Sequence, residues 1–336
     1  MKSVFSFLKV AIPLAFGVFL IWFVFKDLSS QEKAELYEAF RKSNIFWILL
    51  SMFFGILSHV SRAIRWKYTI QPLGKTPRFI NSFLTVMVGY AANLALPRLG
   101  EVTRPGLLAK YEGIPFNKLF GTIVAERVAD LIILAVIMTS IVLMEFDMLR
   151  DMLMEFLEEG SGKFSTQNLL ILMTATLVGG SIFFFFMLSK SNNPFFAKIR
   201  ELLKGILEGV QSIIKMEKKG YFLMHTAFIW IMYVGMFYVC FFSIEETASV
   251  PFSAVLASFV TGSLAIVFVQ GGLGVFPIAI METLMLYGVS KTSSLALGWI
   301  LWSSQTLMVI VVGVLSIPAL RYINRNNKIE STTNSK

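Results

Sequence analysis

Long uncharged apolar runs constrain the fold of this chain more than any other feature. Apolar segments occupy approximately residues 4–25, 45–61, 79–96, 119–143, 168–189, 221–243, 252–288 and 294–320. Several of them approach or exceed the roughly 20 residues that a helix needs to cross a bilayer core. Only 15% of the 336 residues are charged, so a soluble fold would lack the polar surface to cover these runs. We expect an all-α integral membrane protein with a single polytopic membrane domain, residues 1–336.

Composition also narrows the functional classes. Cys240 is the single cysteine, and His59 and His225 lie far apart in the sequence, so neither a disulfide framework nor a metal-ligand spacing is present. The net charge of +9 falls in loops beside apolar segments, where it indicates anionic lipid headgroups as partners and no nucleic acid. The sequence contains no Ser/His/Asp set and no phosphate-binding loop. We therefore expect no catalytic residues, no metal and no cofactor.

The charges of the loops predict the topology. The loop 61–78 has five basic residues and no acid, whereas residues 144–167 contain six acids and two bases. The positive-inside rule then places 61–78, 190–219 and the basic tail 321–336 in the cytoplasm, and the acidic loop outside. The first apolar run lacks a cleavage site and is expected to remain as a span. We expect a multi-pass protein of the cytoplasmic membrane with both termini in the cytoplasm.

Two apolar segments cannot cross fully in this topology. Segment 79–96 follows a cytoplasmic loop and precedes a span that must start inside, so it should begin and end on the same side. The same holds for 252–288, which contains the break "QGGLG". We expect about six full spans and two re-entrant helical elements, arranged as an inverted repeat of residues 1–143 and 168–320. The alternative, with 79–96 as a full span, gives about seven to eight spans.

Two amphipathic helices are expected outside the spans. Apolar residues recur at helical spacing from Phe196 to Ile214 with lysines opposite them, which predicts an interfacial helix in the cytoplasmic loop 190–219. Ser29 and Glu32 have the spacing of a capping box for a short external helix.

Ionisable residues are concentrated in the stretch "LPRLGEVTRPGLLAKYEGIPFNKLFGTIVAERVAD", residues 96–130. Asp130 is roughly 16 Å along the helix expected from residue 119, close to half the bilayer core. Thr122, Glu126 and Asp130 share one face of that helix at a spacing of four residues. Charges at this depth must face protein or water, and they indicate a functional site.

Two interpretations of this stretch are open. In the first, Arg98, Arg104 and Arg127 line a polar cavity and bind an anionic headgroup, because guanidinium groups match phosphate bidentately. In the second, Glu126 and Asp130 neutralise Arg127, and the ion pairs only fix helix packing. The residues expected at the substrate site are Asn93, Arg98, Glu101, Arg104, Glu126, Arg127, Asp130, Gln270, Gly271, Gly272, Gly274 and Glu282.

The stretch 96–130 and the later "GGLGVFPIAI" resemble the signature stretches of the lysylphosphatidylglycerol synthase transmembrane-region family. That family includes the flippase-like membrane half of bacterial multiple peptide resistance factors. Relatives often have an acid shortly after the glycines, where this chain has Phe276 and Pro277, and Glu282 could replace it from one or two turns later. The sequence contains no soluble aminoacyl-transferring domain like that of the bifunctional relatives, so the resemblance implies lipid handling instead of lysine transfer.

These observations predict a flippase-like transporter of phospholipid or of a lipid-linked substrate across the cytoplasmic membrane. Its partners would be membrane lipids, above all anionic phospholipid headgroups. The alternative is a non-transporting membrane partner of a separately encoded lipid-modifying enzyme, and an intramembrane enzyme is a third hypothesis.

Overall fold

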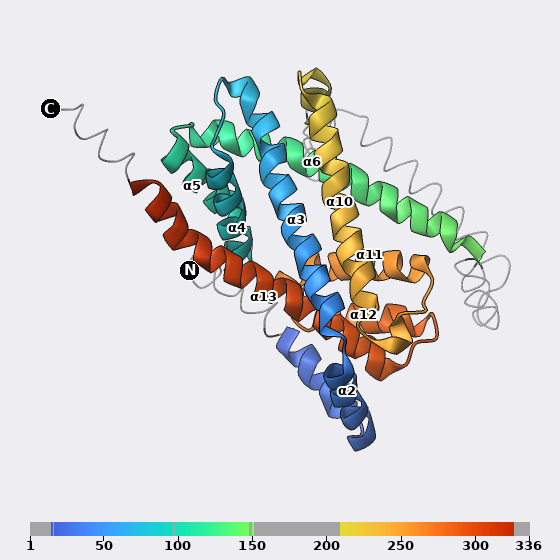
Figure 1. Ribbon diagram of the computed structural model, residues 1–336. Helices are drawn as coiled ribbons and strands as arrows, with labels where there is room; N and C mark the ends of the chain where they lie inside the picture. The colour runs from blue at the N-terminus through green and yellow to red at the C-terminus, as the bar shows by residue number, and fades with distance from the viewer. Residues whose placement is uncertain (1–14, 16, 97, 148–149, 151–208, 326–336) are drawn as a thin grey trace, which may run out of the picture. The chain divides into compact units, whose positions relative to one another are not determined.

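The computed structural model describes residues 15, 17–96, 98–147, 150 and 209–325, and the statements below concern these residues. They form helices and no strands, which confirms the all-α class. Four helical segments are long and apolar enough to cross a membrane: Ile45–Leu73, Phe116–Met144, Lys219–Phe241 and Lys291–Ile323. Shorter apolar helices lie between them in the sequence (Figure 1). The expectation of a membrane protein is therefore confirmed.

The chain divides into two compact units, one formed by residues 1–137 and 216–336 and the other by residues 138–215. The predicted span 168–189 lies outside the described residues, as does most of the interfacial helix predicted in 190–219. All the contacts discussed below belong to the first unit.

Helix α3, Ile45–Ile70, is longer than the predicted segment 45–61. Asn44 is its N-cap, and the Asn44 side chain accepts a hydrogen bond from the Phe46 N–H. The helix continues through Arg62 and Arg65, which are 4% and 0% exposed. The prediction that residues 61–78 form a basic loop is thus wrong for the first ten of them. Carboxylates on another helix pair with both arginines, so these charges are stable inside the protein.

Helices α4, Phe79–Ala95, and α5, Leu99–Glu112, form a hairpin. At its tip, the Gly100 N–H donates to Asn93 Oδ1 at 2.6 Å, and a Cβ added at Gly100 would lie 2.0 Å from the Gly89 carbonyl oxygen. The two helices can approach this closely because neither glycine has a side chain. Residues 99–112 therefore form a helix that returns alongside α4.

The base of this hairpin joins its two ends. Arg78 Nε lies 3.4 Å from Glu112 Oε1, and Asn81 Nδ2 donates to the same carboxylate. Asn81 also exchanges two hydrogen bonds with Asn324, at 3.1 and 2.9 Å. The segment 79–112 thus returns to the end at which it started. The return is made by α5, because residues 79–95 form one continuous helix, so the predicted return within 79–96 itself is not found. Asn324 is buried at the end of α13, so the first residues of the predicted tail 321–336 belong to the folded unit.

The second predicted re-entrant segment, 252–288, is broken as expected. Helix α11, Phe252–Phe268, and helix α12, Val275–Met285, are separated by the short turn η3, Gln270–Gly272. Gly271, Gly272 and Gly274 have φ of 66°, 69° and 75°, a region that L side chains rarely adopt. The Trp302 indole donates to the Gly271 carbonyl at 2.6 Å, which fixes the turn against α13.

The order of elements is the same in the two predicted halves: a long helix, a hairpin and a second long helix. The first set is α3, α4–α5 and α6, Phe116–Met144, and the second is α10, Lys219–Phe241, α11–α12 and α13, Lys291–Ile323. Helices α3 and α10 lie side by side, and α13 packs against α4 (Figure 1). The inverted relation between the halves stays a prediction.

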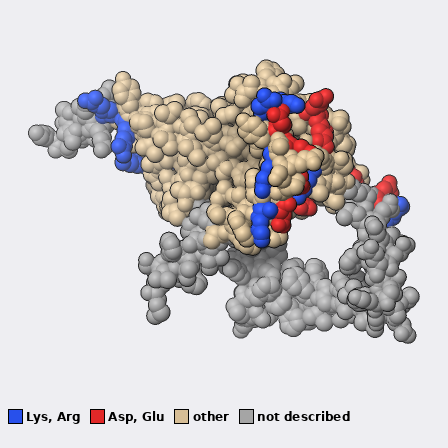
Figure 2. All heavy atoms as spheres, turned by 90° about the horizontal axis from the view of Figure 1, so that it is seen from below, with Lys and Arg blue, Asp and Glu red and all other residues tan. Residues whose placement is uncertain are grey.

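Outside these helices, α2, Ser30–Lys42, has the predicted capping box, with Ser29 and Glu32 each bonded to the other's backbone N–H. Charged side chains gather in separate groups on an otherwise uncharged surface (Figure 2). Large apolar side chains such as Leu143, Ile231 and Val267 are exposed, as expected for helices that face lipid.

Candidate functional site

A buried cluster of arginines and carboxylates joins α3 to α6. Asp130 Oδ2 accepts from Arg62 Nη1 at 2.9 Å, and its Oδ1 accepts from Arg65 Nη1 at 2.8 Å. Arg65 also donates to Thr226 on α10 at 3.0 Å. Buried charges are stable only when they are paired and hydrogen-bonded, and Asp130 meets this condition through two guanidinium groups.

The second carboxylate of the cluster, Glu126, is 1% exposed. Arg104 on α5 binds both of its oxygens, at 3.0 and 3.3 Å, and Arg65 lies 3.6 Å away. The Arg104 guanidinium is 3.7 Å from the centroid of the Trp66 ring, and the Trp66 indole donates to Thr122 at 2.8 Å. The predicted face of Thr122, Glu126 and Asp130 is therefore buried, and it binds the hairpin to α3.

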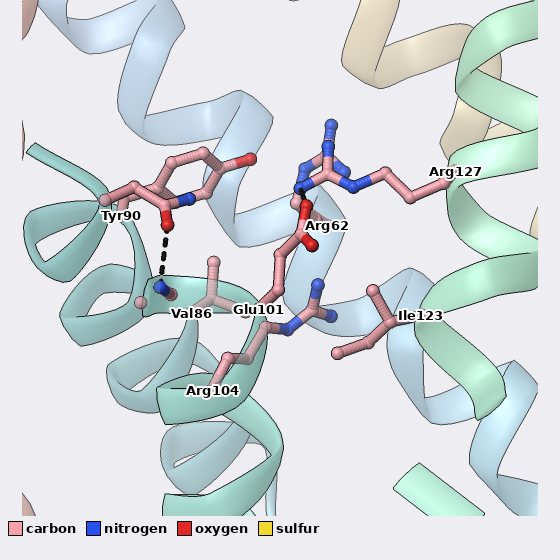
Figure 3. Close-up of a pocket in the computed structure, with 10 residues that line it drawn as sticks. Arg62, Val86, Tyr90, Glu101, Arg104, Ile123 and Arg127 are labelled. Atoms are coloured by element: carbon pink, nitrogen blue, oxygen red, sulfur yellow. Dashed lines mark hydrogen bonds and ion pairs between the residues drawn. The ribbon is translucent and has the colours of Figure 1, made fainter. Parts of the chain in front are cut away.

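Arg127 does not pair with Glu126 or Asp130, contrary to the second interpretation. Its side chain is 49% exposed, and its ion pair is with Glu101 at 3.7 Å. Consecutive helical residues point about 100° apart, so Arg127 leaves the buried face and turns toward α5 (Figure 3). Arg62, Arg65 and Arg104 neutralise the two buried acids instead.

The first interpretation also needs correction. Arg104 is bound by Glu126, and Arg98 is exposed at the start of α5 with φ of 61°. Arg127 is the one of the three arginines that lies at a cavity without a hydrogen-bonded carboxylate among the described residues.

The remaining predicted residues lie in several places. Asn93 and Glu101 lie near the hairpin tip, and Gly271 lines a cavity with Arg127. Gly272 and Gly274 shape the turn after α11, and Gln270 contributes backbone to it. Glu282 is exposed on α12 and lines no cavity described here. The structure therefore does not bring Glu282 to the arginines.

Two cavities meet at the charged cluster. The smaller, about 20 Å³, includes Arg62, Glu101, Arg104 and Arg127 in its lining, and it has room for about one water. The larger has a volume of about 490 Å³. Arg62, Arg127 and Asp130 are its charged lining residues, and its apolar wall includes Leu131, Trp230, Phe237, Phe259, Phe276 and Trp302.

Arg62, Tyr90 and Arg127 line both cavities and so form the boundary between them. The Tyr90 and Tyr233 hydroxyls are 3.3 Å apart, and Arg62 Nη2 donates to Tyr233 at 3.3 Å. The three boundary residues thus come from α3, α4 and α6, and Tyr233 on α10 is hydrogen-bonded to two of them.

Sequence reasoning missed Arg62, Arg65, Tyr90 and Tyr233. Arg62 and Arg65 are three residues apart and therefore share a helix face. That spacing was the available signal, but the positive-inside rule assigned both residues to a loop. No group of three His, Cys, Asp or Glu side chains that could hold a metal is found in the described residues.

Apolar helices long enough to span a bilayer, two hairpins and a buried charged cluster define a multi-pass helical membrane protein. The chain belongs to the lysylphosphatidylglycerol synthase TM region family, whose model matches residues 10–313. Over 91 residues it is 37% identical to a UPF0104 membrane protein of Methanocaldococcus jannaschii, an alignment that covers 26% of this chain and 27% of that protein. No solved structure matches the chain. The resemblance found in the sequence is thereby confirmed.

Proposed function

We propose that the protein is a flippase-like transporter of phospholipid or of a lipid-linked substrate across the cytoplasmic membrane. The observation that supports this function best is the larger cavity, whose lining combines charged side chains with many apolar ones. A lipid has the same division into a polar headgroup and apolar chains. The protein would move its substrate without converting it chemically, and both of its termini would lie in the cytoplasm.

The charges at the cavity favour an anionic headgroup. The described cluster contains the guanidinium groups of Arg62, Arg65, Arg104 and Arg127 and the carboxylates of Glu101, Glu126 and Asp130. Four positive groups against three negative ones leave one positive charge. A headgroup with a single negative charge, such as a phosphodiester, would balance the cluster.

The apolar wall can accommodate acyl chains. Aromatic rings from α10, α11, α12 and α13 contribute to it, and apolar burial favours hydrocarbon there. Leu131 and Val267 also line the cavity and are 54% and 79% exposed. The cavity therefore reaches the surface of the described unit, where a lipid chain can enter from the bilayer.

The position of the cavity also supports transport. In transporters with inverted repeats, the substrate site lies where broken helices of the two halves meet. Here Tyr90 and Leu94 of the first hairpin and Gly271 of the second hairpin line the same cavity. The two hairpins thus meet at this cavity, where both could contact one substrate.

Reconstitution into liposomes tests the proposal. Labelled phosphatidylglycerol and phosphatidylcholine are placed in one leaflet, and their movement is followed by quenching from outside. We expect the purified protein to move the anionic lipid, and Arg127→Ala to reduce the rate. Arg41→Ala is the matched control. Arg41 is exposed on α2, and its ion-pair partner is Glu38 on the same helix, outside the buried cluster. Folded protein that moves no lipid would contradict transport.

A second candidate is a non-transporting membrane partner of a separately encoded lipid-modifying enzyme. The family's description as the TM region of a lysylphosphatidylglycerol synthase favours it. This candidate would be supported if the protein moved no lipid in liposomes and stimulated an added lipid-modifying enzyme. Chemically altered lipid produced by the purified chain alone would indicate an intramembrane enzyme instead.

A further inference from the structure

Arg127 differs from the other three arginines of the cluster. Arg62, Arg65 and Arg104 each donate a hydrogen bond of 2.8 to 3.0 Å to a buried carboxylate. Arg127 lies 3.7 Å from Glu101, beyond hydrogen-bond distance. Its guanidinium is thus neutralised in part and has donors left for another anion.

Glu101 approaches Arg127 from one side. Both residues line the small cavity, and Arg127 also lines the large one, where Glu101 is absent from the wall. In Figure 3 the Glu101 side chain rises from α5 toward Arg127, which extends from α6. An anion in the large cavity can therefore reach Arg127 and take the place of Glu101 as its partner.

The backbone holds Glu101 in place. Gly100, the preceding residue, is fixed by the Asn93 side chain and by its close contact with Gly89. Glu101 also lies in the first turn of α5, where the helix dipole stabilises a carboxylate. Glu101 thus lies close to Arg127, and it keeps a favourable position when it is separated from the arginine.

We propose that Glu101 competes with the anionic headgroup for Arg127. This inference rests on the proposed function and deepens it. In the empty cavity Glu101 occupies Arg127, and a headgroup with a net negative charge displaces it. A zwitterionic headgroup brings no net charge to exchange for the carboxylate. Glu101 is thus a specificity-determining residue that favours anionic over zwitterionic lipids.

The test measures equilibrium binding of labelled phosphatidylglycerol to the full chain in detergent at low salt. Glu101→Gln keeps the size of the side chain and removes its charge. An exposed ion pair contributes up to about 1 kcal/mol, so binding should become about two- to fivefold tighter. The same change should leave binding of labelled phosphatidylcholine less affected. Glu38→Gln, which also removes an exposed paired carboxylate, should leave both affinities unchanged.

Further variants separate this inference from the proposed function. In an Arg127→Gln background, Glu101→Gln should give no further gain, and a full gain there would overturn the inference. Equal affinity of the wild type and Glu101→Gln, both folded by thermal unfolding, would overturn it while anionic lipid binding still supported the proposed function. Absence of anionic lipid binding by the folded wild type would overturn the proposed function as well.

Two controls complete the experiment. Glu101→Asp retains the charge on a shorter side chain, so its affinity should lie between those of the wild type and Glu101→Gln, and it replaces the glutamine variant if that variant fails to fold. Inorganic phosphate should compete less well than unlabelled phosphatidylglycerol, because it leaves the apolar wall empty. Equal competition by phosphate would overturn a lipid as the ligand.

Discussion

The Arg104 guanidinium lies over the Trp66 ring, 3.7 Å from its centroid, while its two terminal nitrogens bind Glu126. This one side chain therefore connects the returning helix of the first hairpin, α5, with α3 and α6. The arrangement makes Arg104 a structural residue, in contrast to the exposed Arg127 one position after Glu126.

Replacement of Arg104 should lower stability strongly. Arg104→Ala leaves Glu126 buried with Arg65 at 3.6 Å as its remaining partner, and breaking a buried pair costs about 3 to 5 kcal/mol. Arg104→Lys keeps the charge and loses the bidentate contact, so it should cost less. Thermal unfolding in detergent measures both. Near-normal unfolding of Arg104→Ala would show that the cluster does not hold the helices together.

Replacement of Arg127 should have the opposite profile. Its side chain is half exposed and its ion pair is loose, so Arg127→Ala should change the free energy of unfolding by less than about 1 kcal/mol. Lipid transport should fall about ten- to a hundredfold, because a charge-assisted contact contributes roughly 1.5 to 3 kcal/mol. Unfolding and transport are measured on the same preparation. Normal transport with lowered stability would instead show that Arg127 is a structural residue.

The tip of the first hairpin can be tested with two alanines in one helix. A Cβ at Gly100 would meet the Gly89 carbonyl at 2.0 Å, whereas a Cβ at Gly106 meets nothing within 4 Å. Gly100→Ala should therefore destabilise the protein by about 1 to 3 kcal/mol through overpacking. Gly106→Ala should be neutral or stabilise it by up to about 1 kcal/mol, because alanine favours helix. Equal effects in thermal unfolding would argue against the close contact of α4 and α5.

Accessibility of single cysteines tests the topology. In a Cys240→Ala background, Lys75→Cys and Glu112→Cys should be shielded from an impermeant thiol reagent in intact cells, because both ends of the hairpin are predicted to be cytoplasmic. Glu245→Cys should react, because Glu245 and Glu246 are acids without basic neighbours between residues 221 and 270, and the positive-inside rule predicts that such a loop is external. Reaction at Glu112 with shielding at Lys75 would place the ends of the hairpin on opposite sides and would contradict the re-entrant arrangement.

The cap of α2 predicts a pH effect. The Ser29 backbone N–H, the Ser29 hydroxyl and Lys291 hold the pKa of Glu32 below its usual value of 4.5. A lowered pKa in the folded state means that Glu32 stabilises the protein above pH 4.5, and that this contribution is lost as the pH falls through the folded-state pKa. Between pH 7 and pH 3 the unfolding temperature should therefore fall less for Glu32→Gln than for the wild type. An identical loss would show that the cap does not contribute.

Local sequence patterns predicted several elements correctly, and their physical basis is short-range. The glycines of "QGGLG" interrupt α11 and α12 because their positive φ angles end a helix. The buried face of Thr122, Glu126 and Asp130 follows from helical spacing alone. The close approach of α4 and α5 depends on Gly89 and Gly100, and no local pattern pairs these two glycines.

Long-range pairing accounts for the errors. Arg62 and Asp130 are 68 residues apart. No local pattern indicates that a carboxylate on α6 pairs with an arginine on α3. The positive-inside rule treats each arginine as a loop residue, so it ended α3 too early. One of the two interpretations paired Arg127 with acids on its own helix because they are close in sequence, whereas its partner Glu101 lies on α5. Glu282 is exposed because α12 turns that side chain outward.

The paired amides of Asn81 and Asn324 define how far the chain can be shortened. Both side chains are buried, and each is donor and acceptor to the other. Ending the protein before Asn324 would leave the Asn81 amide buried without this partner at the point where the hairpin starts and returns. The smallest stable version therefore extends past the last turn of α13, and a purification tag or fused domain is best attached after residue 325.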